Sequence, residues 1–258
     1  MRFHRLVVWA VVLCGWMASP STTAAQPPMP FDHVHLAVPD PEVAAAWYVK
    51  HFGGVAEPPR VRFGTTLFSF IKRSGSPPSV GSVIDHFGFS VPDLDAAMKA
   101  FEASGVKILS PARDVPGLFK LAFIEDPWGS KIEVVQDAEF PGFHHVHLMA
   151  ADPPALLGWY QVTFGGTRAQ LKGRLDGMRY GTVWVLVGAA RAETPAPSVG
   201  RSIDHIGWGT ADLDAAMAWL KEKGIAPTDG PRTAGDLRIA FIEGQSGVRI
   251  EIVQRPKP

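Results

Sequence analysis

Two nearly identical stretches each carry the sequence His-Val-His. "FDHVHLAVPDP" (31–41) and "FHHVHLMAADP" (143–153) match at seven of eleven positions. His33 and His35 are two residues apart, as are His145 and His147, so on a strand each pair points to one face. A duplicated core strand would explain the shared apolar residues. It would not explain the imidazoles, which can bind a metal or move a proton.

Two further histidines and two glutamates recur in the same way. His86 opens "HFGFSVPD" and His205 opens "HIGWGTAD", while Glu133 and Glu251 lie within "KIEVV" and "RIEIV". A carboxylate on an apolar strand is costly to bury unless it is paired or bound to a cation. Two imidazoles and one carboxylate suit Fe(II), Mn(II), Zn(II) or a similar ion. A single strand histidine is more often a hydrogen-bonded core or surface residue, but the recurrence of the whole set favours a metal.

The elements that must position these residues form a repeat. The matched stretches are offset by 112 (31 to 143), 119 (84 to 203) and 118 (122 to 240) residues, which indicates two homologous halves. Within the first half, "DHVHLAVPD" returns as "DHFGFSVPD" 53 residues later. Each unit reads as a strand, an Asp-capped helix ending at Gly, and further strands. We therefore predict an α+β fold of four βαβββ modules, two in each of the domains 31–137 and 143–255.

The N-terminus predicts export. Residues 1–25 combine Arg2 and Arg5, a twelve-residue apolar run and the ending Thr23-x-Ala25, which is typical of a secretory signal peptide cut near Ala25. The run is shorter than the about 20 residues of a spanning helix, although an uncleaved anchor is the alternative. Cys14, the only cysteine, lies in this segment. The mature chain would be thiol-free and periplasmic or secreted.

The charge balance argues against polyanionic partners. Lys plus Arg and Asp plus Glu both number 25, with no basic stripe along the chain. We expect no nucleic-acid partner, no membrane association after signal cleavage, and a monomer or homodimer.

The modules, the "DH" strand openings and "FIEDPWGSKIEVV" resemble the vicinal oxygen chelate superfamily. It includes glyoxalase I, type I extradiol dioxygenases, fosfomycin-thiol transferases and bleomycin-resistance proteins. The resemblance implies that each domain is a curved mixed sheet forming a metal-binding cup. It implies a divalent ion (Fe, Mn, Zn or Ni) and these six ligands: His33, His86, Glu133, His145, His205 and Glu251.

Several departures from the family bear on the reaction. Glyoxalase I adds a fourth protein ligand, where this chain has Ser69 and Leu186. Extradiol dioxygenases carry a catalytic Tyr, where this chain has Phe123 and Phe241. A thiol transferase needs a cytosolic thiol supply that an exported protein lacks.

The leading hypothesis is an exported metal-dependent enzyme that chelates neighbouring oxygens of a small substrate and stabilises an oxyanion or enolate. His35 and His147 are the candidate general bases or substrate hydrogen-bond partners. An anionic substrate would be attracted by one of the matched cation pairs: Arg62 with Arg179, or Lys120 with Arg238. The alternatives are an extradiol-type dioxygenase and a non-catalytic, bleomycin-resistance-like binding protein. The latter would use an aromatic groove of Trp47, Phe68, Trp159 and Trp184, residues that more often belong to a core.

The six ligands can be grouped within each half or between the halves. We expect the within-half grouping, with His33, His86 and Glu133 in one site and His145, His205 and Glu251 in the other. His51 and His144 are predicted to be surface residues. Gly244-Gln245 replaces Asp126-Pro127 in the second half, so a less typical turn is expected before Glu251.

Overall fold

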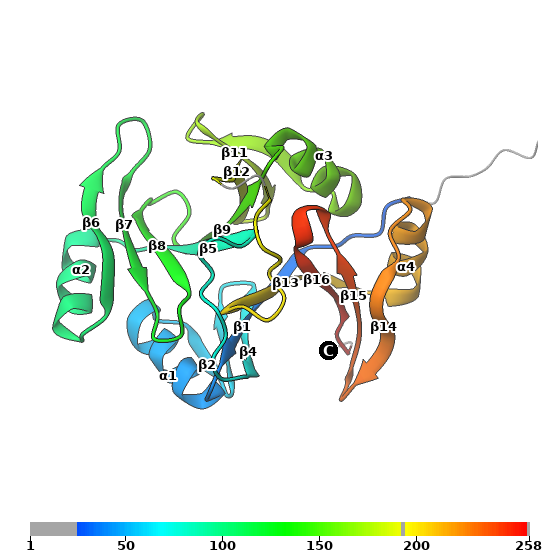
Figure 1. Ribbon diagram of the computed structural model, residues 1–258, viewed down its shortest axis with the longest axis horizontal. Helices are drawn as coiled ribbons and strands as arrows, with labels where there is room; N and C mark the ends of the chain where they lie inside the picture. Colours follow the sequence, from blue (N-terminus) through cyan, green and yellow to red (C-terminus); the bar gives the residue numbers. More distant parts are fainter. Residues whose placement is uncertain (1–24, 192–193, 257–258) are drawn as a thin grey trace, which may run out of the picture.

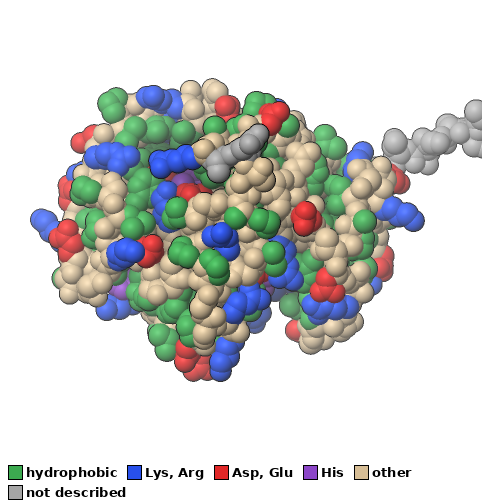
Figure 2. Space-filling view, viewed as in Figure 1, with side chains coloured by type: hydrophobic (Ala, Val, Ile, Leu, Met, Phe, Trp, Pro, Cys, Tyr) green, Lys and Arg blue, Asp and Glu red, His purple; other side chains and the backbone are tan. Residues whose placement is uncertain are grey.

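The computed structural model describes residues 25–191 and 194–256. The predicted signal peptide, apart from Ala25, lies outside the described residues. No helix within the described part of the chain is both long and apolar enough to cross a bilayer. Figure 2 shows cationic and anionic side chains interspersed over one face of the molecule, in line with their equal numbers.

Four βαβββ modules follow one another along the chain, as predicted. The first comprises β1 (Phe31–Val38), α1 (Pro41–Phe52), β2 (Val55–Glu57), β3 (Arg60–Phe63) and β4 (Thr66–Lys72), and the second β5 (Ile84–Ser90), α2 (Leu94–Ala103), β6 (Lys107–Asp114), β7 (Lys120–Glu125) and β8 (Lys131–Gln136). The third comprises β9 (Gly142–Ala150), α3 (Pro153–Phe164), β10 (Thr167–Leu171), β11 (Leu175–Tyr180) and β12 (Val183–Ala189). The fourth comprises β13 (Ile203–Thr210), α4 (Leu213–Glu222), β14 (Pro227–Ala234), β15 (Leu237–Glu243), the short 3-10 helix η1 (Gln245–Gly247) and β16 (Arg249–Gln254).

Each long helix begins where the sequence places an aspartate. The side chains of Asp40, Asp93, Asp152 and Asp212 accept hydrogen bonds from backbone N–H groups in the first turn of α1 to α4. These caps satisfy donors that have no partner inside the helix. They also fix where the first strand of each module ends.

The modules combine into two eight-stranded curved mixed sheets. One sheet has the order β14-β15-β16-β13-β1-β4-β3-β2, and the other has the order β10-β11-β12-β9-β5-β8-β7-β6. In Figure 1 the blue start and the red end of the chain therefore share a sheet, while the cyan-to-green middle forms the other. Two similar eight-stranded units were predicted, but each unit joins modules from different halves of the chain: the first with the fourth, and the second with the third.

The two faces of each central strand have different neighbours. On β1, Val34 and Leu36 are fully buried in the main core, while His33 and His35 alternate with them and point to the other face. The main core lies between the sheets, where the rings of Phe68 and Phe143 pack edge to face with centroids 5.2 Å apart. Each fully buried side chain of this size contributes about 1.5–3 kcal/mol to folding. The facing sides of the two sheets form this core, and their opposite sides carry the histidines.

A buried hydrogen bond ties α1 to the turn before β8. The Tyr48 hydroxyl donates to Asp126 Oδ2 over 2.6 Å, and Asp126 Oδ1 accepts from the backbone N–H groups of Trp128 and Ser130. Burial raises the pKa of Asp126 to about 6. In the matching turn Gly244 stands where Asp126 does, and the Tyr160 hydroxyl is buried without a hydrogen-bond partner among the described residues. The less typical turn predicted before Glu251 is the 3-10 turn η1.

Because of this difference, removing the Tyr48 hydroxyl should destabilise the fold, whereas removing the Tyr160 hydroxyl should not. Tyr48→Phe should lower the free energy of unfolding by about 1–3 kcal/mol, because it leaves a buried carboxyl oxygen unpaired. Tyr160→Phe is the matched control and should be neutral or stabilising, because the hydroxyl it removes has no partner. Thermal unfolding at fixed pH measures both variants. Equal losses would show that the Tyr48–Asp126 hydrogen bond does not carry the effect.

Candidate metal centres

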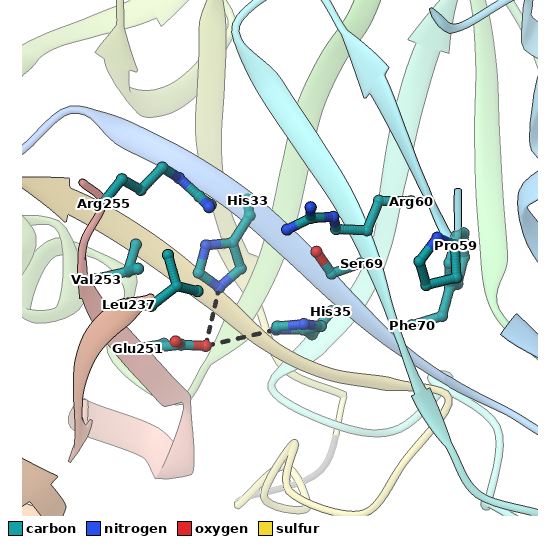
Figure 3. A pocket seen from close by; sticks show the side chains of 10 residues that line it. All are labelled: His33, His35, Pro59, Arg60, Ser69, Phe70, Leu237, Glu251, Val253 and Arg255. Atoms are coloured by element: carbon teal, nitrogen blue, oxygen red, sulfur yellow. Dashed lines mark ion pairs between the residues drawn. The ribbon is translucent and has the colours of Figure 1, made fainter. Parts of the chain in front are cut away.

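The first centre is formed by His33, His35, His205 and Glu251, whose donor atoms lie within 4.8 Å of one another. His33 and His35 come from β1, His205 from the antiparallel β13, and Glu251 from β16, which is parallel to β13. In Figure 3 the rings of His33 and His35 on β1 and the carboxylate of Glu251 on β16 converge. All four side chains therefore come from the first and fourth modules.

The second centre is formed by His86, Glu133, His145 and His147, which meet the same distance limit. His145 and His147 come from β9, His86 from the antiparallel β5, and Glu133 from β8, which is parallel to β5. The two centres are therefore the same construction, made once in each sheet.

The expected within-half grouping is wrong. His33 lies with His205 and Glu251, and His145 lies with His86 and Glu133, so each centre takes residues from both halves. The physical reason is the pairing of β1 with β13 and of β9 with β5. His33 and His86 are in different sheets and cannot share an ion.

The spacing of the donor atoms fits a bound ion. In the first centre Glu251 Oε2 lies 3.2 Å from His33 Nε2 and 3.0 Å from His205 Nε2. In the second centre Glu133 Oε2 lies 3.2 Å from the Nε2 atoms of both His86 and His145. Ligands about 2.1 Å from one ion lie about 3.0 Å apart in an octahedron and about 3.4 Å apart in a tetrahedron. The observed spacings match this range.

Two of these nitrogens make no hydrogen bond within the described part of the chain. His33 Nε2 and His145 Nε2 are buried and, despite their short distances to the carboxylates, lack hydrogen-bond geometry to any partner among residues 25–191 and 194–256. A buried polar atom without a partner is rare because it loses its hydration without compensation. Convergent lone pairs of this kind are what a cation satisfies, so the donor set fits a divalent metal.

Glycine makes room for one ligand in each centre. Gly207 lies opposite His33 across the sheet, and a Cβ there would approach His33 Cε1 to 2.0 Å. Gly88 lies opposite His145, and a Cβ there would approach His145 Cε1 to 2.2 Å. The motif His-x-Gly in the second and fourth modules thus complements His-Val-His in the first and third. A side chain at either glycine would displace the ligand ring.

Electrostatic interactions keep both glutamates ionised. Burial alone would raise their pKa, but the neighbouring imidazoles, among them His86 beside Glu133 and His205 beside Glu251, hold the pKa of both glutamates well below the usual value. Burial would lower the pKa of His33, yet its hydrogen bond to Asp32 and the negative charges of Glu251 and Asp32 raise it to about 9. Binding of a metal at His33 must therefore release a proton.

His35 and His147 stand beside the ligands as possible fourth donors, a role that the sequence analysis did not assign to them. His35 Nδ1 lies 2.6 Å from His205 Nε2, which is a hydrogen-bond distance, and 3.5 Å from Glu251 Oε2. Burial lowers the pKa of His35 to about 3 and that of His147 well below its usual value, so both are neutral. The sequence feature that indicates this role is the two-residue spacing, which places His35 on the same strand face as His33, and His147 on the same face as His145. The side chain of His35 is 22% exposed, against 2% for His33, so a substrate would reach His35 first.

The first centre opens into a cavity of about 260 Å³ with a polar rim. Arg60 from β3 and Arg255 beyond β16 approach it from opposite sides, and Ser69 lies between Arg60 and His35 (Figure 3). The buried Nε of Arg60 has no hydrogen-bond partner in the described part of the chain, whereas Arg255 donates to Asp32. This cavity offers cationic donors next to the candidate metal ligands.

The second sheet fills the matching space with apolar side chains. Trp184 and Leu186 on β12 take the places of Leu67 and Ser69, and Gly177 takes the place of Arg60. They join an apolar cluster that includes Phe119, Leu121, Val135, Phe140 and Leu171. A separate cavity of about 310 Å³ reaches His86 and His147 from the side of Lys131 and Arg191. The two centres therefore differ in their surroundings more than in their ligands.

Three of the four predicted cations form ion pairs away from the two centres. Arg62 makes a two-point ion pair with Glu57, Arg238 does so with Asp214, and Lys120 pairs with Asp95. Arg179 is exposed on β11. Arg60 and Arg255 were not singled out from the sequence, because their direction depends on which strands pair.

The prediction for His144 is also wrong. His144 is fully buried, next to His145, and burial together with the neighbouring imidazole lowers its pKa to about 4. It was assigned to the surface because its counterpart in the repeat is Asp32 and not a histidine. His51 is half-buried against Trp47 and Phe101, and it belongs to neither centre.

The four residues of the predicted aromatic groove belong to two different apolar clusters. Phe68 is fully buried in the main core, Trp47 and Trp159 pack against that core, and Trp184 belongs to the apolar cluster of the second sheet. The core interpretation was therefore correct for the first three.

The sequence matches a known family over most of its length. The profile of the Glyoxalase/Bleomycin resistance protein/Dioxygenase superfamily matches residues 31–134 and again residues 142–252. A lactoylglutathione lyase of Pseudomonas aeruginosa is 47% identical over 51 residues, which are 20% of this chain and 28% of that enzyme. The chain thus matches less than a third of the length of that relative.

Solved structures share the arrangement of both sheets. Glyoxalase I from Zea mays superposes with a TM-score of 0.66 at 18% identity, covering 88% of this chain and 92% of the maize chain. A Bacillus subtilis protein assigned provisionally to the dioxygenases gives a TM-score of 0.65 at 17% identity, covering 90% and 87% of the two chains. At these identities the likeness establishes the fold.

Proposed function

This chain belongs to the Glyoxalase/Bleomycin resistance protein/Dioxygenase superfamily, and from that membership we propose that it is a divalent-metal-dependent enzyme acting at the first centre. The proposed substrate is a small anion with two neighbouring oxygens, and the proposed reaction is proton transfer next to a carbonyl. The observation that carries the proposal is the cavity, which His35, Arg60 and Arg255 line together with His33 and Glu251 of the candidate metal site.

Each residue has a distinct role in this proposal. His33, His205 and Glu251 would hold the ion, which when bound supplies a positive charge that stabilises an enolate-like oxygen. Arg60 would bind the anionic group of the substrate, because its buried Nε donor has no partner in the described chain. His35, a neutral imidazole at the cavity wall, would accept the substrate proton and return it. All of these residues come from one chain, so the proposal requires no second copy.

Catechol cleavage is the less favoured candidate. Phe241 packs edge to face on the ring of His205, with centroids 5.2 Å apart, and Phe123 packs in the same way on His86 at 5.4 Å. These are the positions where the family resemblance would place a catalytic tyrosine, and neither side chain has a hydroxyl. We also propose export, for which the support is the sequence of residues 1–25 alone.

Solvent deuterium exchange tests the proposed chemistry without knowledge of the natural substrate. Zn²⁺- or Mn²⁺-loaded protein in D₂O should exchange the C–H proton next to the carbonyl of small hydroxy-carbonyl acids, as followed by proton NMR. His35→Gln should reduce the exchange rate by about 10²–10⁴-fold, the usual size of a general acid–base contribution. His147→Gln, in the second centre, is the matched control and should leave the rate unchanged. Binding of these compounds by metal-free protein, with no exchange by the loaded protein, would instead support a binding module.

A further inference from the structure

Three of the four ligand histidines are held in the same way. In each, Nδ1 lies 2.6–2.7 Å from the carboxylate of the preceding aspartate, which is paired in turn with a basic side chain. The three arrangements are His33–Asp32–Arg255, His86–Asp85–Lys131 and His205–Asp204–Arg249. A carboxylate at Nδ1 keeps a proton on that nitrogen, so Nε2 faces the centre and is the nitrogen that would bind a metal once it is unprotonated.

The fourth ligand histidine has a longer connection. His145 Nδ1 lies 2.8 Å from His144 Nδ1, and His144 Nε2 lies 3.4 Å from Asp137 Oδ2, at the long end of the hydrogen-bond range. Asp137 Oδ1 is 2.9 Å from Lys172 Nζ. The connection therefore also ends on a carboxylate and a cation, but an imidazole is inserted between the carboxylate and the ligand.

The internal repeat shows that two positions differ together. Asp32 corresponds to His144 at the offset of 112, and Arg255 corresponds to Asp137 at the offset of 118. The first centre thus has a cation behind an anion, where the second has an anion behind an imidazole. If only one of these two positions differed between the halves, two like charges or an unpaired polar group would lie in a buried place. His144 is fully buried and Asp137 is only 5% exposed.

We propose that His144 and Asp137 form a relay that positions His145 as a metal ligand. A contact of 2.8 Å between two Nδ1 atoms requires one of them to carry a proton and the other to accept it. Asp137 accepts a hydrogen bond from the Nε2–H group of His144, so a neutral His144 has an unprotonated Nδ1. His145 must then donate from its own Nδ1, which leaves its Nε2 lone pair directed toward Glu133. The inference rests on the proposed metal function, applied to the second centre.

Apolar rings surround His144 and leave no place for water to take over its hydrogen bonds. The rings of Phe119 and Phe140 stand edge-on to His144, with centroids 5.6 and 6.1 Å away. His144 therefore could not be replaced by solvent without opening the apolar cluster. An asparagine, by contrast, carries an oxygen that accepts from His145, as Asp32 accepts from His33, and an amide that donates toward Asp137.

Zinc affinity of the full chain tests the relay. The background is Glu251→Ala, which leaves the second centre as the only complete one, and Zn²⁺ is titrated in competition with a chromophoric chelator. His144→Phe keeps the ring but removes both polar contacts, and it should weaken Zn²⁺ binding by about 10–100-fold, the usual effect of losing such a partner. His144→Asn should retain most of the affinity. Unchanged affinity in the His144→Phe protein would overturn the relay while leaving the metal site in place.

The tautomers provide a measurement that requires neither a variant nor a metal. In the metal-free wild-type chain, long-range proton–nitrogen NMR spectra should show His145 protonated at Nδ1 and His144 at Nε2. The reverse assignment would overturn the relay, even if the variants do not fold. Failure of the Glu251→Ala background to bind Zn²⁺ at all would contradict the metal function of the second centre, and the relay with it.

Discussion

The double variant Glu133→Ala/Glu251→Ala should bind no metal, whereas the wild-type chain should bind up to two divalent ions. Each glutamate is the only carboxylate in its centre, and its Oε2 atom is the point at which the ligand histidines converge. Without it, each site keeps only neutral or partly protonated imidazoles. Since losing a hydrogen-bond partner behind a ligand costs 10–100-fold in affinity, losing the ligand itself should cost more than about 100-fold.

Metal content and thermal stability report this loss independently. Bound metal stabilises the folded chain by about 2.7 kcal/mol when the free ion is at 100 times its Kd, so added Zn²⁺ should raise the Tm of the wild type and not that of the double variant. Glu243→Ala, an exposed glutamate on β15, is the matched control and should behave like wild type. Undiminished metal content in the double variant would show that the glutamates are not ligands.

Sequence reasoning identified the elements of the fold because their signals are local. The aspartates that cap the helices and the alternation along the strands predicted the four modules. The same reasoning placed the six predicted ligands on strand faces, and the structure brings them together as His33 with His205 and Glu251, and His145 with His86 and Glu133. Metal binding by these residues remains a prediction.

The pairing of the modules could not be predicted, because the local patterns fit both solutions. The His-Val-His strand of either half complements a strand in which glycine follows histidine by two residues, and both Gly88 and Gly207 meet this need. The choice depends on how the linkers and the core between the sheets pack. Residues whose role depends on that choice, such as Arg60, were missed for the same reason. His144 is different, since its equivalence to Asp32 in the repeat was visible and would have indicated a place behind a ligand.

Two double variants of the full chain should differ in how much metal they lose. The account assigns His33 and Glu251 to one centre, so His33→Ala/Glu251→Ala should lose one equivalent and retain the ion of the second centre. His33 and Glu133 belong to different centres, so His33→Ala/Glu133→Ala should lose both. Each single variant should lose one.

The comparison is informative because the alternative predicts the reverse. If each centre were built within one half, His33 would share an ion with Glu133, and the second double variant would be the one that keeps an equivalent. Circular dichroism of the purified proteins confirms that the variants compared are folded. The deciding measurement is the zinc content per chain after removal of free metal: one equivalent in His33→Ala/Glu251→Ala and none in His33→Ala/Glu133→Ala supports centres shared between the halves, and the opposite pattern contradicts them.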